Sequence, residues 1–527
     1  DINMNFKFSN GTRKSIESSF IEVNNFSGKL KTGNINGNFK IVNFKQPNIT
    51  LNVNGALELN TVNDFIHIDT IETITGNIKG NIFFHGQLAK VANFTVKDYI
   101  NSKVEGEIKV DNCTIKLKNS KQKYANISGD FVFNNNDVIA KDLKGNLIMN
   151  ESNIKNNDFI INGIFTNIIP YIFLKGQNLN VNADFYSNNI EIDKLLVVLN
   201  NQQNNTNTNN NPYNFQLPEN LNLNLNIRIK DLSFNKFNAY MASGKIYLKN
   251  KQIIANEVKF NTMDWKVLIS GLLDNNRDNK ILLSCDATVY DINISKLFYQ
   301  FNNFGQQNIK YNNINGTLNA DIQFAAFCNN SFTIDANTIY VKSSVNIENG
   351  QLLNYKPIEG LSKYIKWKDL SNIKFYSLTN QIEVKNRNVY IPQMEIKSSA
   401  LNLNLWGNHN FDNQIEYHIN VSLSDLKKNT AKTTKKEEFG DIEDDGLNKF
   451  NYFFLITGTV DNPIYNIIDK QAYKEKIIND IKKEKESLKE ILKNEFGLKK
   501  NDTLKLNKKE EFKKKQGNDF IYEWEEE

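Results

Sequence analysis

The sequence has few of the residues on which covalent and metal-based sites depend. It contains three cysteines, four histidines, five methionines, four tryptophans and seven prolines in 527 residues. Cys113, Cys285 and Cys328 are far apart and form no C-x-x-C pair, so their spacing predicts neither a disulfide framework nor a zinc site. We expect the three thiols to be buried, inert hydrophobic groups.

Sequence motifs for catalysis and nucleotide binding are also lacking. The chain has no G-x-S-x-G elbow, no H-E-x-x-H, no G-x-x-x-x-G-K-[ST] loop and no G-x-G-x-x-G. The net charge of +5 is small for this length, and the lysines are interspersed with acids, which argues against a nucleic-acid surface. We therefore predict a protein that is not an enzyme, uses no metal or cofactor and binds no nucleic acid.

Long hydrophobic runs are absent as well. The most apolar stretch, FIINGIFTNIIPYIFL at 159–174, is too short to span a hydrocarbon core of about 30 Å and contains Asn162, Asn167 and Pro170. It predicts a strand followed by a short buried helical turn. The chain begins at Asp1 rather than at methionine, so we expect a longer protein whose first part, including any anchor, precedes this sequence.

What dominates the sequence is alternation of apolar with polar residues. Segments such as GALELN, SKVEGEIKVDNCTIKLKN and GKIYLKNKQIIANEVKF change character at every position and then reach Asn, Gly or Asp. This period of two predicts a long succession of half-buried antiparallel strands. The turns NNND, KNK, ENG and KNRN supply residues that tolerate positive φ. In YSNNIEIDKLLVVL, VYDINISKLFYQF and ALELNTVNDFIHID a short helical cluster follows a strand.

Changes in composition divide the chain. We expect residues 1–200 to form the first part of a β-structure, 201–214 (NQQNNTNTNNNPYN) an Asn-rich linker, and 215–468 a second β-region with a disordered loop at 427–449. The charged tail at 469–527 contains an amphipathic helical pattern from Ala472 to Asn494. The acidic run DIEDDG in the loop resembles the start of a calcium loop, but Tyr452 stands where a glutamate is required, so a solvated loop is predicted.

The stretch SSALNLNLWGNHNFDNQIEYHINVSLSDL at 398–426 gathers two histidines, two aspartates and a glutamate. Placing its two apolar sets on one face requires residue 411 to oppose 415 across a three-residue loop at 412–414, with Asn413 left-handed. His409 then opposes Tyr417 on the apolar face and Asn408 opposes His418 on the other face, so the two histidines form no dyad. His67 and His85 are solitary and are expected to have ordinary surface or packing roles.

The segment PIEGLSKYIKW at 357–367 predicts a short helix with two alternative roles. Lys363 and Lys366 lie near Tyr364 and Trp367, a composition suited to a membrane surface. A helix that caps the end of a sheet has the same pattern. The sequence leaves both roles open.

The order of these elements resembles the AsmA-like family of Gram-negative envelope proteins, related to TamB, in the form found in Bacteroidetes. The resemblance is densest from LPENLNLNLNIRIKDLSF (Leu217 onward) through SVNIENGQLLNYKPIEGLSKYIKWKDLSNIKF to ITGTVDNPIYN, and it reaches back more weakly to Phe39. The glycine usual in one turn is Arg387 here, which Asn386 or Asn388 offsets by taking the left-handed position.

The resemblance implies a mainly β fold: a long twisted antiparallel sheet curled into a U-shaped hydrophobic groove, with a few short amphipathic helices and a C-terminal helix. It implies a periplasmic protein, anchored in the inner membrane by an N-terminal helix outside this chain, that bridges phospholipid transfer toward the outer membrane or its proteins. Under this reading the groove is lined by the apolar face of the 398–426 hairpin: Leu401, Leu403, Leu405, Ile415, Tyr417, Ile419, Val421 and Leu423.

The residues support part of this expectation without the family. About 30 strands at roughly 4.8 Å would extend on the order of 140 Å, and few helices are available to cover one apolar face. That face must fold on itself as packed core or shelter something apolar. Two other classes stay open: a scaffold or assembly factor for outer-membrane proteins that offers strand edges, and a hydrolase whose catalytic residues follow no known motif.

Overall fold

The structure is a computed structural model of the full chain. Its described residues are 2–30, 32–65, 71–88, 96–118, 123–148, 157–200, 215–262, 265–277, 279–305, 307, 309–363, 370–398, 402–422 and 451–468. These residues form one sheet of 23 strands with a few short helices, so the predicted mainly β class is confirmed.

The strands are long, and most consist of the alternating segments recognised in the sequence. The first ten are β1 (Ile2–Ser9), β2 (Phe20–Leu30), β3 (Gly33–Val42), β4 (Asn48–Glu58), β5 (Ile71–Gln87), β6 (Lys103–Leu117), β7 (Lys123–Asn134), β8 (Asp137–Ile148), β9 (Asn157–Thr166) and β10 (Leu179–Glu191). The next six are β11 (Leu221–Phe234), β12 (Phe237–Lys249), β13 (Gln252–Thr262), β14 (Trp265–Arg277), β15 (Lys280–Asn293) and β16 (Ile314–Cys328). The last seven are β17 (Tyr340–Leu353), β18 (Asn372–Lys385), β19 (Asn388–Lys397), β20 (Asn402–Asn410), β21 (Ile415–Ser422), β22 (Asn451–Gly458) and β23 (Pro463–Ile468).

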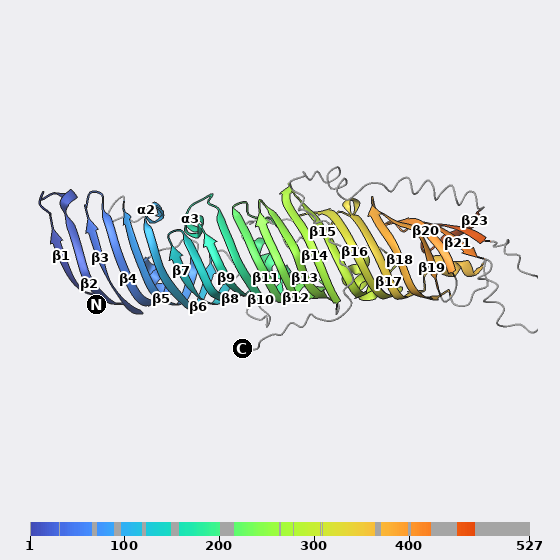
Figure 1. The fold of residues 1–527 in the computed structure, drawn as a ribbon, viewed down its shortest axis with the longest axis horizontal. Helices are drawn as coiled ribbons and strands as arrows, with labels where there is room; N and C mark the ends of the chain where they lie inside the picture. Colours follow the sequence, from blue (N-terminus) through green and yellow to red (C-terminus); the bar gives the residue numbers. More distant parts are fainter. Residues whose placement is uncertain are drawn as a thin grey trace, which may run out of the picture. The chain divides into compact units, whose positions relative to one another are not determined.

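The sheet is a meander in which each strand pairs with the next one in the chain. Figure 1 shows this succession from β1 in blue to β23 in orange-red. In the described part of the chain β1 and β23 do not pair with each other, so the sheet is open. Among the described residues the sheet has 23 strands, where the sequence predicts about 30.

One pairing departs from the predicted antiparallel pattern. β10 and β11 are parallel, with Leu179 opposite Leu221 and Glu191 opposite Ser233. The connection between them contains α4 (Ile192–Asn200) and runs on to residue 220, where the Leu179 N–H donates to the Asn220 carbonyl at 2.9 Å. The chain therefore returns to the strand end at which β10 began, and β11 must run in the same direction as β10.

Short helices occupy several other connections. The α-helices besides α4 are α1 (Leu59–Phe65), α2 (Val96–Ile100), α3 (Ile168–Phe173), α5 (Ile294–Gln300) and α6 (Lys356–Glu359). The 3-10 turns are η1 (Ile16–Ser18), η2 (Asn302–Gly305), η3 (Ala336–Thr338) and η4 (Gly360–Lys363). The predicted strand-then-helix segments are confirmed as α1, α4 and α5. α3 follows β9 as expected, but Ile172 and Phe173 are 56% and 42% exposed, so the turn is less buried than predicted.

Helices that span a membrane need a long apolar run, and no helix in the described ranges combines that length with that apolarity. The predicted linker 201–214, the loop 427–449 and the tail 469–527 with its helix at 472–494 lie outside the described residues. The sheet itself continues across the position of the linker through the pairing of β10 with β11.

Asparagine supplies the left-handed residues that the turns require. Asn135, Asn250 and Asn386 lie in turns with φ near +50°, as the turn sequences predicted. Asn349 is also left-handed, but it lies inside the strand β17, so the turn predicted at ENG is wrong. Arg387, which stands where the resembling family has glycine, is also left-handed with φ +60°. The turn KNRN is therefore made by two consecutive left-handed residues: Asn386 takes this conformation as expected, but it does not spare Arg387, which takes it as well.

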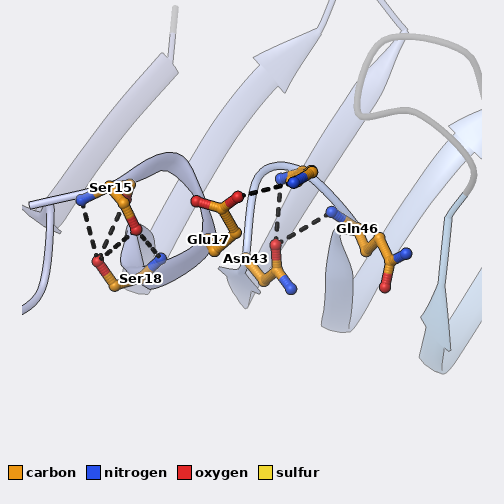
Figure 2. Close-up of polar contacts among 6 residues, drawn as sticks. Ser15, Glu17, Ser18, Asn43 and Gln46 are labelled. Carbon is orange, nitrogen blue, oxygen red and sulfur yellow. Dashed lines mark hydrogen bonds and ion pairs between the residues drawn. The ribbon is translucent and has the colours of Figure 1, made fainter. Parts of the chain in front are cut away.

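Side chains tie neighbouring strand-end connections together near the N-terminus. Figure 2 shows Ser15 and Ser18 exchanging hydrogen bonds at the start of η1, while the Asn43 Oδ1 atom accepts from the backbone N–H groups of Lys45 and Gln46 at 3.2 and 3.1 Å. The Lys45 Nζ atom donates to Glu17 at 2.9 Å, which is the main reason that the pKa of Glu17 is lowered to about 2. This exposed pair links the β1–β2 connection to the β3–β4 connection.

Candidate functional site

One face of the sheet carries a row of aligned apolar residues and glycines. Because side chains alternate between faces along a strand, residues that pair directly across strands share a face. We call the following set the central apolar row. From β1 to β21 its members are Ile2, Gly28, Ile35, Gly55, Gly80, Ile108, Phe131, Ala140, Gly163, Ala183, Leu225, Ile246, Ala255, Gly271, Cys285, Phe324, Val341, Val384, Val389, His409 and Ile415. His409 is its single polar member.

A second apolar row lies beside the central one on the same face. From β1 to β16 its members are Met4, Phe26, Gly37, Val53, Ile82, Gly106, Phe133, Val138, Phe165, Val181, Leu223, Leu248, Ile253, Leu273, Leu283 and Ala326. The opposite face is polar at the adjacent positions near the N-terminus, where Asn36, Asn54 and Asn81 align and are exposed. The sheet therefore has an apolar face that is continuous over many strands.

The central apolar row is only partly covered by protein. Most of its members are half-buried, and Ile82 in the second row is 38% exposed. In the described part of the chain every extensive contact between strands joins chain neighbours, so no second sheet packs on this face. A face of this kind leaves apolar surface available to another apolar molecule.

The short helices pack on the apolar face near the strand ends. Ile168 and Tyr171 of α3 join a cluster with Val181, and Ile294 of α5 joins a cluster with Leu318. α2 and α3 both follow strands that end at the same edge of the sheet, as Figure 1 shows. These helices cover the margins of the face, while most members of the central apolar row stay half-buried.

Three phenylalanines connect opposite ends of the strands. Phe332 follows β16 and its ring lies 5.1 Å from that of Phe215, which precedes β11. The same Phe332 ring lies 6.4 Å from that of Phe234, the last residue of β11. Phe215 precedes β11 and Phe234 ends it, so this contact, which we call the phenylalanine bridge, links the two ends of one strand.

The predicted groove-lining residues lie at the C-terminal end of the face, and six of the eight are described. Leu403, Leu405, Ile415, Tyr417, Ile419 and Val421 are 0–8% exposed. They belong to one core cluster that includes Ile358 of α6 and Leu361 of η4. The apolar sets of β20 and β21 share one face, as predicted. Leu401 and Leu423 lie outside the described residues, and the role of all eight in a groove stays a prediction.

The register of this hairpin differs from the predicted one by two residues. His409 opposes Ile415 and Gly407 opposes Tyr417, with the three-residue loop at 411–413 instead of 412–414. The reason is Asn410, whose side-chain Oδ1 accepts the backbone N–H groups of Asp412 and Gln414 at 3.0 and 2.9 Å and starts the turn one residue early. A shift of two keeps every side chain on its predicted face. Asn413 is left-handed with φ +65°, as expected.

The two histidines lie on opposite faces, as predicted, and have different partners. His409 Nδ1 is 2.8 Å from the Tyr417 hydroxyl, which is 3.3 Å from the Tyr355 hydroxyl inside the apolar core. His418 stacks on Trp406 at 4.5 Å, and its Nε2 is 3.1 Å from Glu416. Both histidines have packing roles in this geometry, because each imidazole is buried against an aromatic ring.

The remaining candidate chemistry also has structural surroundings. His85 Nδ1 contacts the Thr50 hydroxyl at 2.9 Å, while His67 lies outside the described residues. Burial raises the pKa of Cys113 and of Cys328 to about 11 and is the main cause that raises that of Cys285 to about 12, which makes these thiols poor nucleophiles. Cys113 and Cys328 are buried as expected, and Cys285 is half-buried. Within the described ranges no group of three acidic, histidine or cysteine side chains is arranged to hold a metal.

Burial of His409 predicts a pH-dependent contribution to stability. Burial lowers the pKa of His409 to about 4, below its unfolded value near 6.5. The contribution of the neutral side chain is therefore complete above pH 6.5 and falls by roughly 3 kcal/mol as the pH approaches 4. We expect urea unfolding of the wild type to lose more stability between pH 7 and pH 4.5 than that of His409→Asn, which does not titrate. Equal pH dependence of the two proteins would contradict this burial.

Sequence reasoning found the apolar face but missed the phenylalanine bridge. Phe215, Phe234 and Phe332 lie in separate loops or strand ends, and no local pattern connects them. No protein-family model matches the chain, and no curated protein or solved structure is significantly similar to it.

Proposed function

We propose that this protein is a non-enzymatic carrier of phospholipid, of the AsmA-like type, which shields acyl chains along its apolar face between the inner and outer membranes. The observation that carries the proposal is the central apolar row, which crosses 21 consecutive strands with one polar member. Phospholipids are the ligands, the periplasm is the compartment, and support of outer-membrane biogenesis is the role.

The energetic basis is the hydrophobic effect. Each methylene of an acyl chain costs about 0.8 kcal/mol in water. An acyl chain laid on the half-buried rows removes its own apolar surface and that of the protein from water. Since the rows repeat Ile, Val, Leu, Phe, Ala and Gly, neighbouring positions offer similar contacts and no deep trap. This uniformity favours movement along the face.

The phenylalanine bridge supports a face that curls into a groove. A β11 of 14 residues is about 45 Å long when extended. The four residues from Cys328 to Phe332 reach at most about 14 Å. Contact of Phe332 with both Phe215 and Phe234 therefore brings the two ends of β11 toward each other. This approach supports a trough with the apolar rows inside.

The extent of the sheet supports transfer over a distance greater than one bilayer leaflet. The 22 steps between 23 strands, at about 4.8 Å each, make a hydrogen-bonded path of about 105 Å. This is several times the roughly 30 Å thickness of a hydrocarbon core. The polar opposite face, with its aligned asparagines, keeps the sheet in water while the apolar face holds lipid.

The C-terminal end of the face is closed by α6 and η4. Because Leu403, Leu405 and their neighbours pack under these helices, lipid reaches them only if the cap moves. The part of the face available without such movement is the half-exposed stretch from β3 to β8, because from β11 to β15 the second apolar row packs against α4 and the phenylalanine bridge. This favours the capping role for residues 357–363, while residues 364–367 of the predicted helix lie outside the described residues.

Native mass spectrometry of the protein purified without detergent tests the proposal. We expect bound phospholipid, released by mild activation and identified by its fragment masses. The alternative is a scaffold that offers strand edges; β1 and β23 each pair on one side only among the described strands. A scaffold would bind extended peptides and carry no lipid, so a lipid-free protein that binds such peptides favours it.

A further inference from the structure

A cluster of exposed aromatic side chains projects from the connection between β15 and β16. Tyr299, Phe301, Phe304 and Tyr311 are 55%, 46%, 48% and 44% exposed. The rings of Phe301 and Phe304 stack at 5.5 Å, and those of Tyr299 and Tyr311 meet edge-on at 5.5 Å. Contiguous exposed aromatic surface of this kind marks an interaction site.

The backbone holds this aromatic cluster outward. Asn302, Asn303, Phe304 and Gly305 are four consecutive left-handed residues, with φ of 51°, 53°, 54° and 72°. Phenylalanine is strained in this conformation. The turn is fixed because the Asn303 Oδ1 atom accepts the Tyr311 N–H at 2.9 Å. The structure thus maintains an unfavourable local conformation that exposes Phe304.

The surroundings of the cluster are cationic. Lys236 Nζ lies 5.5 Å from the Tyr299 ring centre, and Lys296 and Lys310 are exposed on the same connection. Residues 292–320 contain no aspartate or glutamate. The nearby carboxylate of Asp461 interacts electrostatically with Lys310, but it already forms an ion pair with Lys356, whose Nζ atom lies 2.6 Å from Asp461 Oδ1.

We propose that this aromatic–lysine cluster docks the protein on a membrane surface that contains anionic phospholipid. Tyrosine and phenylalanine rings partition into the boundary between head groups and acyl chains, and lysines pair with the phosphates. The combination of aromatic rings, cations and no acids in the segment fits this surface better than a neutral protein partner. Docking concerns attachment to a bilayer and does not depend on lipid carriage along the apolar face.

Vesicle flotation with the full chain tests the docking. Vesicles of phosphatidylcholine with phosphatidylglycerol are compared with vesicles of phosphatidylcholine alone. We expect the wild type to float with the anionic vesicles, and the double variant Phe301→Ser, Phe304→Ser to bind them at least fivefold more weakly. The double variant Lys236→Gln, Lys310→Gln should lose the preference for anionic lipid and the sensitivity to salt.

The matched control is the double variant Tyr290→Ser, Tyr376→Ser, which removes two aromatic residues that are 54% and 83% exposed elsewhere on the sheet. It should bind vesicles as the wild type does, and far-UV circular dichroism should be unchanged in all variants. The docking is overturned if the wild type does not float or if the Phe301→Ser, Phe304→Ser variant binds vesicles as well as the Tyr290→Ser, Tyr376→Ser control. It is also overturned if the only effect of Phe301→Ser, Phe304→Ser is to convert a dimer of the chain into monomers. Flotation without bound lipid in mass spectrometry would instead reject the carrier function and leave the docking.

Discussion

Val53→Glu is expected to slow phospholipid transfer between donor and acceptor vesicles on the order of tenfold. Val53 lies in the second apolar row between Gly37 and Ile82. A carboxylate placed against a passing acyl chain must lose water without gaining a partner, which costs several kcal/mol. A tenfold change in rate needs only about 1.4 kcal/mol. The measurement is the transfer of a fluorescent phospholipid, with native mass spectrometry to follow occupancy.

Asn54→Glu is the matched control for this prediction. Asn54 is the next residue of β4, is exposed on the polar face and aligns with Asn36 and Asn81. It receives the same new side chain on the same strand, but the carboxylate stays in water. Transfer by Asn54→Glu should equal that of the wild type. If both variants are slowed alike, or neither is, the apolar face is not the path of the lipid.

Ile419→Glu is expected to destabilise the C-terminal core by about 4 kcal/mol or more. Ile419 is 0% exposed between Leu405 and Phe454, under the α6–η4 cap. Its replacement buries an unpaired carboxylate, and the lost apolar contacts add to that cost. Urea unfolding followed by tryptophan fluorescence measures the change, because Trp406 lies on the adjacent strand β20.

Ile464→Glu is the control for the core substitution. Ile464 lies on β23, is 58% exposed and opposes Thr457 on the other face of the sheet. The same change of residue there should alter the free energy of unfolding by no more than about 0.5 kcal/mol. A small effect of Ile419→Glu, comparable with that of Ile464→Glu, would show that the cap is loose and that β20 and β21 belong to the open face.

The sequence carried enough information for the class of fold and for the face of most side chains. Alternation with period two places Leu403, Leu405 and Ile419 together whatever the exact register. The register predicted for the hairpin at 398–426 was wrong by two residues because the side chain of Asn410 accepts hydrogen bonds from two backbone N–H groups and sets the start of the turn. The stretch contains several asparagines, and the sequence does not specify which of them makes these hydrogen bonds. The face assignment survived because an even shift preserves it.

Other features depend on contacts between distant residues and had no local signal. The parallel pairing of β10 with β11 follows from where a long connection ends, which periodicity does not specify. The phenylalanine bridge joins residues from three loops or strand ends. The cover over the predicted groove residues by Ile358 and Leu361 requires a helix to fold back on the face, one of two roles that the sequence left open.

The meander makes this sheet thermodynamically one-dimensional. Every strand exchanges hydrogen bonds with its chain neighbours, so stability is close to a sum of strand terms and interface terms, as in repeat proteins. Folding can begin at any hairpin and propagate in both directions with short loop closures. The two longest closures are the parallel junction, where β10 ends at Glu191 and β11 begins at Leu221, and the link where β21 ends at Ser422 and β22 begins at Asn451. Cooperativity is therefore expected to be weakest at these two links.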